Sequence, residues 1–157
     1  MRITRLLVAF AALALGFSTP VYGQEPSAEA ADSLAYTLIY ADSTGASHFA
    51  DEAIYLASVL IGGAVRPTPG SILRHARGLA FFCPPPGTAT TWYRAPRRQF
   101  NLVLSGEFIV QVSSGESRRF GPGGILLTAD TVGQGHRTSV IGSGQACFAS
   151  VAVPEQE

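Results

Sequence analysis

Short apolar runs separated by turn residues recur along the chain from residue 34 onward. The runs fall at 34–41, 47–60, the end of 72–83, 91–112, 118–130, 136–142 and 146–153. Gly- and Pro-rich segments such as CPPPGTAT at 83–90 and TVGQG at 131–135 separate them. Strands at about ten-residue spacing, with such turns and no long helical period, predict an all-β sandwich or barrel.

Three stretches need a closer reading. DEAIYLASVL at 51–60 is expected to be strand, although its apolar residues also fit two helical turns. The segment 62–71 is expected to be an irregular loop, because two prolines interrupt it. The stretch 91–112 is the longest strand-like one, with Pro96 near its start and Gly106 at a bend. One domain, residues 34–153, accounts for the whole pattern.

The first 23 residues have the pattern of a secretory signal peptide. Arg2 and Arg5 precede an apolar region from Leu6 to Phe17, and Val21 and Gly23 suit a cleavage point after Gly23. The apolar region is short for a membrane anchor, and no other stretch is apolar enough to cross a bilayer. Residues 24–33 are small and polar and are expected to be a flexible leader. The sequence thus predicts export, to the periplasm or the exterior.

The numbers and types of charged residues exclude two classes of function. The precursor has eleven basic and eleven acidic residues, and removal of 1–23 leaves nine and eleven, a net charge of −2. Nucleic-acid binding is not expected without a basic excess. Every basic residue other than histidine is Arg, so Schiff-base chemistry, which needs a lysine, is excluded.

The two cysteines, Cys83 and Cys147, allow two interpretations. They lie 64 positions apart, with no CxxC and no zinc-finger spacing. In an oxidising compartment they could form one disulfide. Each also lies in an apolar run, where a free cysteine behaves as a small core residue.

The stretch from Trp92 to Gly124 resembles the cupin superfamily. The phrases that carry the resemblance are SHF, APRRQF, LSGE, RRFGPG and GQGHRTS, and the similarity covers nearly all of 36–153. The resemblance implies a jelly-roll β-barrel of two antiparallel sheets, and it also implies homodimers that pair edge to edge.

Cupin motifs usually supply metal ligands, which this chain lacks at the matching positions. Gly106 and the Pro-Gly-Gly of 122–124 match the glycine and proline skeleton. The HxH positions hold Tyr93 and Ala95 (or Trp92 and Arg94), the Glu position holds Gln99, and the second-motif His position holds Leu127. These side chains do not provide the imidazoles and carboxylate that Fe, Mn, Ni or Zn would need, so no metal and no cofactor are expected. A site built from His48, His136 and Asp130 is the alternative.

Strand alternation predicts which side chains face the barrel interior. With Tyr93 inward, Ala95, Gln99, Asn101 and Val103 share its face. A buried amide such as Gln99 needs a partner, either within the core or on a ligand. Arg94 and Arg98 are then expected to point outward.

Asp130 and His136 flank the TVGQG turn and could face each other. An Asp–His pair can act as a general acid or base, because the carboxylate orients the ring and raises its basicity. Asp130 could equally bond the turn amides as an Asx motif.

Three further residues are candidate ligand contacts. His48 joins the site if its side chain enters the cavity, and is otherwise a surface histidine. Trp92 lies beside Tyr93, and Arg97 could clamp a carboxylate or phosphate.

These features support three hypotheses about function. The first is a metal-independent protein that binds a small organic ligand through Tyr93, Gln99, His136, His48, Trp92 and Arg97. The second is a metal-free lyase or isomerase that uses His136 as base, Asp130 as its orienting partner and Tyr93 or an Arg to stabilise negative charge. The third is a structural role, with the barrel filled by side chains.

Overall fold

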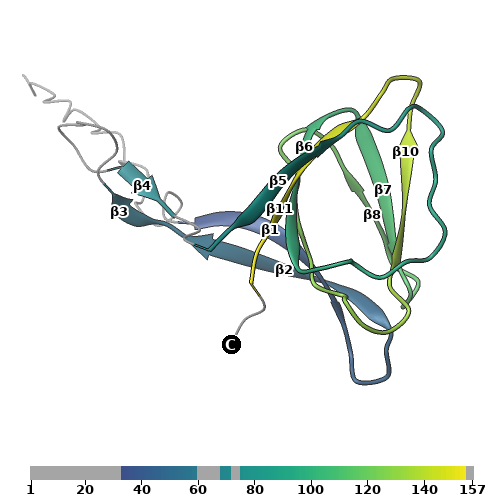
Figure 1. Ribbon diagram of the computed structural model, residues 1–157, viewed down its shortest axis with the longest axis horizontal. Helices are drawn as coiled ribbons and strands as arrows, with labels where there is room; N and C mark the ends of the chain where they lie inside the picture. Colours follow the sequence, from purple (N-terminus) through teal and green to yellow (C-terminus); the bar gives the residue numbers. More distant parts are fainter. Residues whose placement is uncertain (1–32, 60–67, 72–74, 155–157) are drawn as a thin grey trace, which may run out of the picture.

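The chain forms a barrel of β-strands with a ribbon that projects from it (Figure 1). The computed structural model describes residues 33–59, 68–71 and 75–154, so the predicted signal peptide and most of the leader lie outside the described residues. The described elements are all strands: β1 (Ser33–Ala41), β2 (Ser47–Tyr55), β3 (Ala57–Val59), β4 (Thr68–Gly70), β5 (Arg77–Phe82), β6 (Gln99–Ser105), β7 (Glu107–Val112), β8 (Ser117–Phe120), β9 (Ile125–Thr128), β10 (His136–Ile141) and β11 (Cys147–Ala152). No helix of membrane-spanning length and hydropathy occurs in these ranges.

Two sheets form the barrel wall. The larger has the order β2-β1-β9-β6-β11-β5, and the smaller has the order β10-β7-β8. The β3–β4 pair forms a separate two-stranded ribbon beyond the outer end of β2 (Figure 1). The all-β, two-sheet architecture expected from the spacing of apolar runs is thereby confirmed.

One strand pair departs from the expected antiparallel pattern. Strands β1 and β9 run parallel, with Thr37, Leu38 and Ile39 beside Leu126, Leu127 and Thr128. Parallel neighbours need a long connection between them, and the segment from 42 to 124 supplies it. The other strand pairs that the structure describes are antiparallel.

Two expectations about local structure were wrong. The segment 62–71 was expected to be wholly irregular, but Thr68–Gly70 forms β4, which pairs with β3. Proline is tolerated in such a two-stranded edge ribbon, where a missing N–H breaks no central ladder. Within the stretch expected as strand at 91–112, residues 91–98 form a loop that touches β10 through a single bridge at Tyr93.

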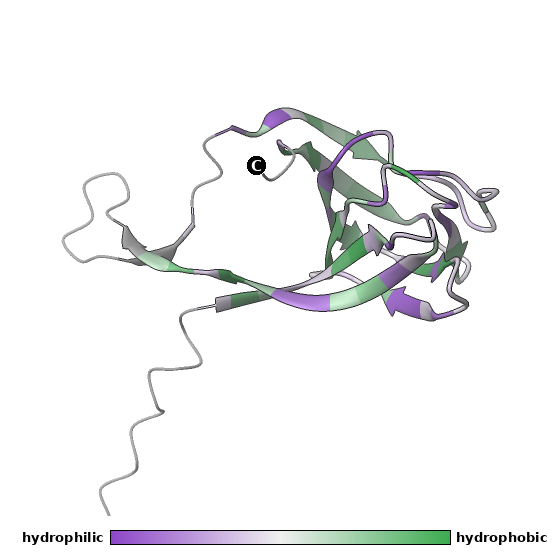
Figure 2. Ribbon diagram, turned by 90° about the horizontal axis from the view of Figure 1, so that it is seen from below, coloured by the Kyte–Doolittle hydropathy of each residue, from purple (hydrophilic) through white to green (hydrophobic). Residues whose placement is uncertain are grey.

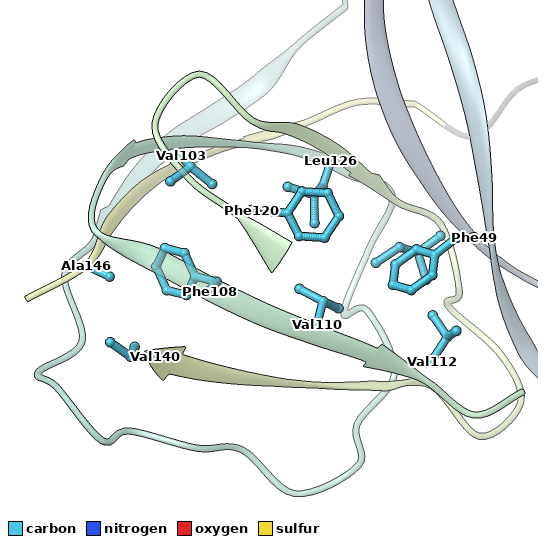
Figure 3. Close-up of a cluster of buried hydrophobic side chains, with 10 residues drawn as sticks. Phe49, Val103, Phe108, Val110, Val112, Phe120, Leu126, Val140 and Ala146 are labelled. Carbon is cyan, nitrogen blue, oxygen red and sulfur yellow. The ribbon is translucent and has the colours of Figure 1, made fainter. Parts of the chain in front are cut away.

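The hydrophobic core lies between the two sheets (Figure 3). On β7, Phe108, Val110 and Val112 are buried while the residues between them are partly exposed, as a period of two requires. Phe49 of β2 and Phe120 of β8 pack against these side chains. Apolar colouring is accordingly concentrated on the barrel strands in Figure 2.

A disulfide joins Cys83, just after β5, to Cys147 at the start of β11. Of the two interpretations open from the sequence, the bridged one is therefore observed. Since β5 and β11 are neighbours in the larger sheet, the bridge fixes the start of the loop 83–98 against this sheet.

Candidate functional site

The barrel contains a partly open cavity of about 230 Å³. Its wall combines core side chains with a smaller number of polar ones. The lining residues are Ile39, Phe82, Tyr93, Ala95, Pro96, Gln99, Asn101, Val103, Phe108, Val110, Phe120, Leu126, Thr128, His136, Thr138, Phe148 and Ser150. The predicted inward face of Tyr93, Ala95, Gln99, Asn101 and Val103 lines the cavity in full. The hypothesis of a barrel filled by side chains is not supported.

Three polar side chains form a chain of hydrogen bonds at this cavity. His136 Nδ1 lies 2.7 Å from Asp130 Oδ2, and its Nε2 lies 3.1 Å from the Tyr93 hydroxyl. Asp130 is fully buried and His136 is only 3% exposed. Because a carboxylate accepts only, Nδ1 carries the proton, and in the neutral imidazole Nε2 then accepts from the Tyr93 hydroxyl. We refer to Asp130, His136 and Tyr93 as the relay.

The backbone around the relay explains how distant residues meet. Tyr93 and His136 exchange both backbone hydrogen bonds, each with an N···O distance of 2.9 Å. The amide of Ala95 donates to the carbonyl of Asp130. The loop 83–98 is thus attached to both ends of the TVGQG turn, and residues 43 positions apart in sequence share one site.

Asp130 does not bond the turn amides as an Asx motif would. Its Oδ2 accepts from His136, and its Oδ1 is buried with no hydrogen-bond partner among the described residues. An unsatisfied buried carboxylate oxygen is costly, and such cost is typical of functional sites. The interpretation as a partner of His136 therefore replaces the turn interpretation.

A second polar group, which we call the amide network, lines the cavity from three strands. Asn101 Oδ1 accepts from Gln99 Nε2 at 3.3 Å and from Ser150 Oγ at 2.5 Å. Asn101 Nδ2 donates to Thr128 Oγ1 at 3.2 Å. Gln99 therefore has a partner within the core network, and it also lines the cavity, so a ligand contact stays a prediction.

Three predicted ligand contacts lie outside the cavity wall. His48 is on the face of β2 opposite Ser47 and Phe49, where it bonds Asp42 at 2.8 Å and stacks on Tyr40. A metal site from His48, His136 and Asp130 is accordingly not formed.

Trp92 and Arg97 are also absent from the cavity wall. Trp92 is the extended-chain neighbour of Tyr93 and faces outward, with the Arg137 guanidinium 5.2 Å from its ring centre. Arg97 is exposed in the bend after Pro96. An arginine clamp on a ligand in the cavity was therefore a wrong expectation.

The metal positions implied by the cupin resemblance need one correction. Leu127 is buried but does not line the cavity, whereas its strand neighbours Leu126 and Thr128 do. His136, unlike Leu127, lines the cavity together with Tyr93, Ala95 and Gln99.

This set does not fit a first-row transition metal. It offers one imidazole, whose ring nitrogens face Asp130 and Tyr93, and no carboxylate in the cavity wall. Within the described ranges no cluster of three or more His, Cys, Asp or Glu occurs.

Burial raises the pKa of the Tyr93 phenol above its usual 10. The negative charge of Asp130 adds to the rise, and a hydrogen bond from Thr138 opposes it. Since the folded-state pKa is the higher one, the neutral phenol favours folding below pH 10, and this contribution is lost as the pH rises through the folded-state value. The relay therefore keeps its Tyr93 proton through neutral and mildly alkaline pH.

A spectroscopic titration tests this. The difference in absorbance at 295 nm between the wild type and Tyr93→Phe should show one phenol that ionises above pH 10. A difference titration centred below pH 10 would contradict a raised pKa of the Tyr93 phenol.

The sequence missed Thr128, Thr138 and Ser150 as cavity residues. Thr128 is separated from Leu126 by one residue on β9, and Ser150 lies opposite Asn101 on β11. Alternation divides the residues of each strand between two faces, but only the register between strands shows which face points into the barrel.

Comparison with known proteins adds limited information. No protein-family model matches the chain, and no curated protein does. A solved structure of a predicted oxalate decarboxylase from Thermotoga maritima has 17% identity and a TM-score of 0.42, covering 76% of this chain and 93% of its own. A conserved protein of unknown function from Streptococcus pyogenes has 15% identity and a TM-score of 0.40, covering 66% and 97%. Similarity of this degree assigns no activity to the chain.

Proposed function

We propose that this protein is a cupin-like binding protein that holds a small organic molecule in the barrel cavity without a metal. The observation that carries the proposal is the cavity itself, a partly open and mostly apolar space that polar side chains also line. Such a combination is typical of small-molecule sites, where apolar walls provide affinity and a few polar groups fix orientation. The side chains beside Tyr93 do not fit a transition metal, which supports ligand binding without one.

The polar side chains would bind the ligand at two places. The Tyr93 hydroxyl, oriented by His136, would meet one polar atom of the ligand. The amide network around Gln99 and Asn101 would meet another. Both groups are already held by hydrogen bonds within the protein, so little ordering would be needed when the ligand enters.

Ligand linkage provides the test. A panel of small alcohols, phenols, sugars and organic acids is screened by thermal denaturation, and the best compound is measured by calorimetry. A ligand at 100 times its Kd should stabilise the fold by about 2.7 kcal/mol.

A matched pair of variants locates the binding. Ala95→Phe projects a ring into the cavity and should abolish the stabilisation, because Ala95 lines the wall and is only 3% exposed. Val132→Phe adds the same ring at a position that is 61% exposed and should leave binding unchanged. Equal binding to both variants, or no binding to the wild type, would refute the proposal.

The relay favours a second candidate function, a metal-free lyase or isomerase. A carboxylate that orients a histidine, which in turn contacts a phenol, can take up and return a proton at the Tyr93 oxygen. If so, a bound ligand with an acidic C–H should exchange it in heavy water, and His136→Gln should stop this exchange while retaining binding. Binding without any exchange would favour the binding protein.

We further propose a homodimer and export. Strand β5 is an edge of the larger sheet and all six of its residues are exposed, with Leu79 at 60% and Phe81 at 65%. Unprotected apolar edges tend to pair, and a second copy would cover this one. Sedimentation should show a dimer for the wild type and a monomer for Phe81→Ser, and a monomeric wild type would contradict the proposal.

Export rests on the signal-peptide pattern of residues 1–23 and on the disulfide, because such bonds persist in oxidising compartments. N-terminal sequencing of the exported protein should begin at Gln24. A mature protein that retains Met1 would contradict cleavage.

A further inference from the structure

The chemistry of the cavity wall restricts the class of ligand. Resting on the proposed function, we infer that the ligand is an uncharged molecule about the size of one substituted ring, with hydrogen-bond donors at two places and an apolar body. The inference draws on three observations: the absence of fixed charge around the cavity, the acceptors that the wall leaves open, and the volume.

Fixed charge is absent from both cavities described in the barrel. The 17 residues that line the inner cavity include no Arg, Lys, Asp or Glu. An adjoining cavity of about 400 Å³ is equally free of them; it is lined by Phe82, Cys83, Pro84, Thr88, Thr90, Tyr93, Phe108, Thr138, Val140 and Phe148. A ligand that extends from one cavity into the other through the shared residues therefore meets no ionised side chain.

Neither Asp130 nor His136 offers a free charge that would compensate a ligand charge. Asp130 is fully buried behind His136 and does not line the cavity. The ring nitrogens of His136 face Asp130 and Tyr93. A carboxylate or phosphate in the cavity would lose its hydration without gaining a cation, and an ammonium group would lose it without gaining an anion.

The open positions on the wall are mainly acceptors. The Tyr93 hydroxyl donates its proton to His136, and its oxygen accepts a hydrogen bond from Thr138, which leaves one lone pair of the phenolic oxygen open. Gln99 donates through Nε2 to Asn101, and its Oε1 accepts no hydrogen bond from the described residues. A ligand with a hydroxyl or N–H group at each of two places satisfies both oxygens.

The volume limits the size. An apolar cavity of about 150 Å³ holds a benzene molecule, so in proportion the inner cavity holds about nine non-hydrogen atoms. Ten apolar side chains, which include Phe108, Phe120 and Phe148, line the cavity and would surround the ligand body. A ring with two polar substituents matches this size and this wall.

A panel of four matched classes tests the inference. 4-Hydroxybenzyl alcohol represents neutral rings with two donors, 4-methylanisole represents neutral rings with none, 4-hydroxybenzoate represents anions and 4-hydroxybenzylamine represents cations. Several aromatic and cyclic members of each class are titrated into the full mature protein by calorimetry, with Ala95→Phe as the blocked control.

The expected result is that neutral donors bind to the wild type and that the best member of each other class binds at least tenfold more weakly. Gln99→Leu should weaken the neutral donors at least fivefold while changing 4-methylanisole little. Anions or cations that bind as tightly as the neutral donors would overturn the inference while leaving the proposed function standing, and so would donor-free rings of equal affinity. If no class binds, both the inference and the proposed function are wrong.

Discussion

Gly135→Ala should lower the free energy of unfolding by about 4 kcal/mol or more, which few single substitutions reach. Gly135 has a φ of +77°, and a Cβ there would overlap the Tyr93 carbonyl group and lie 2.7 Å from the Arg94 backbone nitrogen. Tyr93 cannot move away, because its backbone exchanges two hydrogen bonds with His136. The clash therefore separates the loop 83–98 from β10 and disrupts the relay.

A matched glycine distinguishes the clash from backbone strain. Gly142 has a φ of +82°, and a Cβ there meets no atom within 4 Å. Gly142→Ala should lower the free energy of unfolding by only about 1 kcal/mol, the cost of placing a residue with a Cβ in a left-handed backbone conformation. Urea denaturation of both variants measures the difference, and equal losses would show that the Tyr93–Gly135 contact does not constrain the site.

Loss of the disulfide should lower the free energy of unfolding by about 4 kcal/mol. The bond between Cys83 and Cys147 closes a loop of 64 positions. In the chain-entropy account, opening this loop raises the entropy of the unfolded chain and so stabilises the unfolded state by an amount of that size. The neighbouring Phe82 and Phe148 line both cavities, so ligand binding should weaken as well.

The double variant Cys83→Ser/Cys147→Ser, compared with the wild type in urea, measures this effect. Reduction of the wild type should reproduce the loss, and the double variant should be insensitive to the reductant. Equal stability of oxidised and reduced wild type would contradict a structural role for the bond.

The sequence predicted the parts of the fold that depend on local pattern. The spacing of apolar runs indicated the strands, and alternation along β6 placed Gln99, Asn101 and Val103 on the cavity wall. Tyr93 and Ala95 reach the same wall from the loop 83–98. The pairing of Asp130 with His136 followed from a short turn, which holds its two ends close whatever the rest of the chain does.

Features that depend on distant contacts were not predictable from one sequence. Leu127 was expected to face the cavity, but register on β9 turns Leu126 and Thr128 inward instead. The position of the His48 side chain depended on which face of β2 meets the core. Pairing with β1 fixed this face, with Phe49 toward the core and His48 on the opposite side. The disulfide required two residues 64 positions apart to meet on neighbouring strands, which composition alone does not show.

The ring resonances of the three histidines provide the most direct test of the ligand site. Only His136 lines the cavity, while His48 bonds Asp42 and His75 is exposed. Addition of the tightest-binding panel compound should shift the His136 ring signals and leave those of His48 and His75 in place. Shifts confined to His48 or His75, or no shift at a saturating concentration, would contradict a ligand site at Tyr93 and His136.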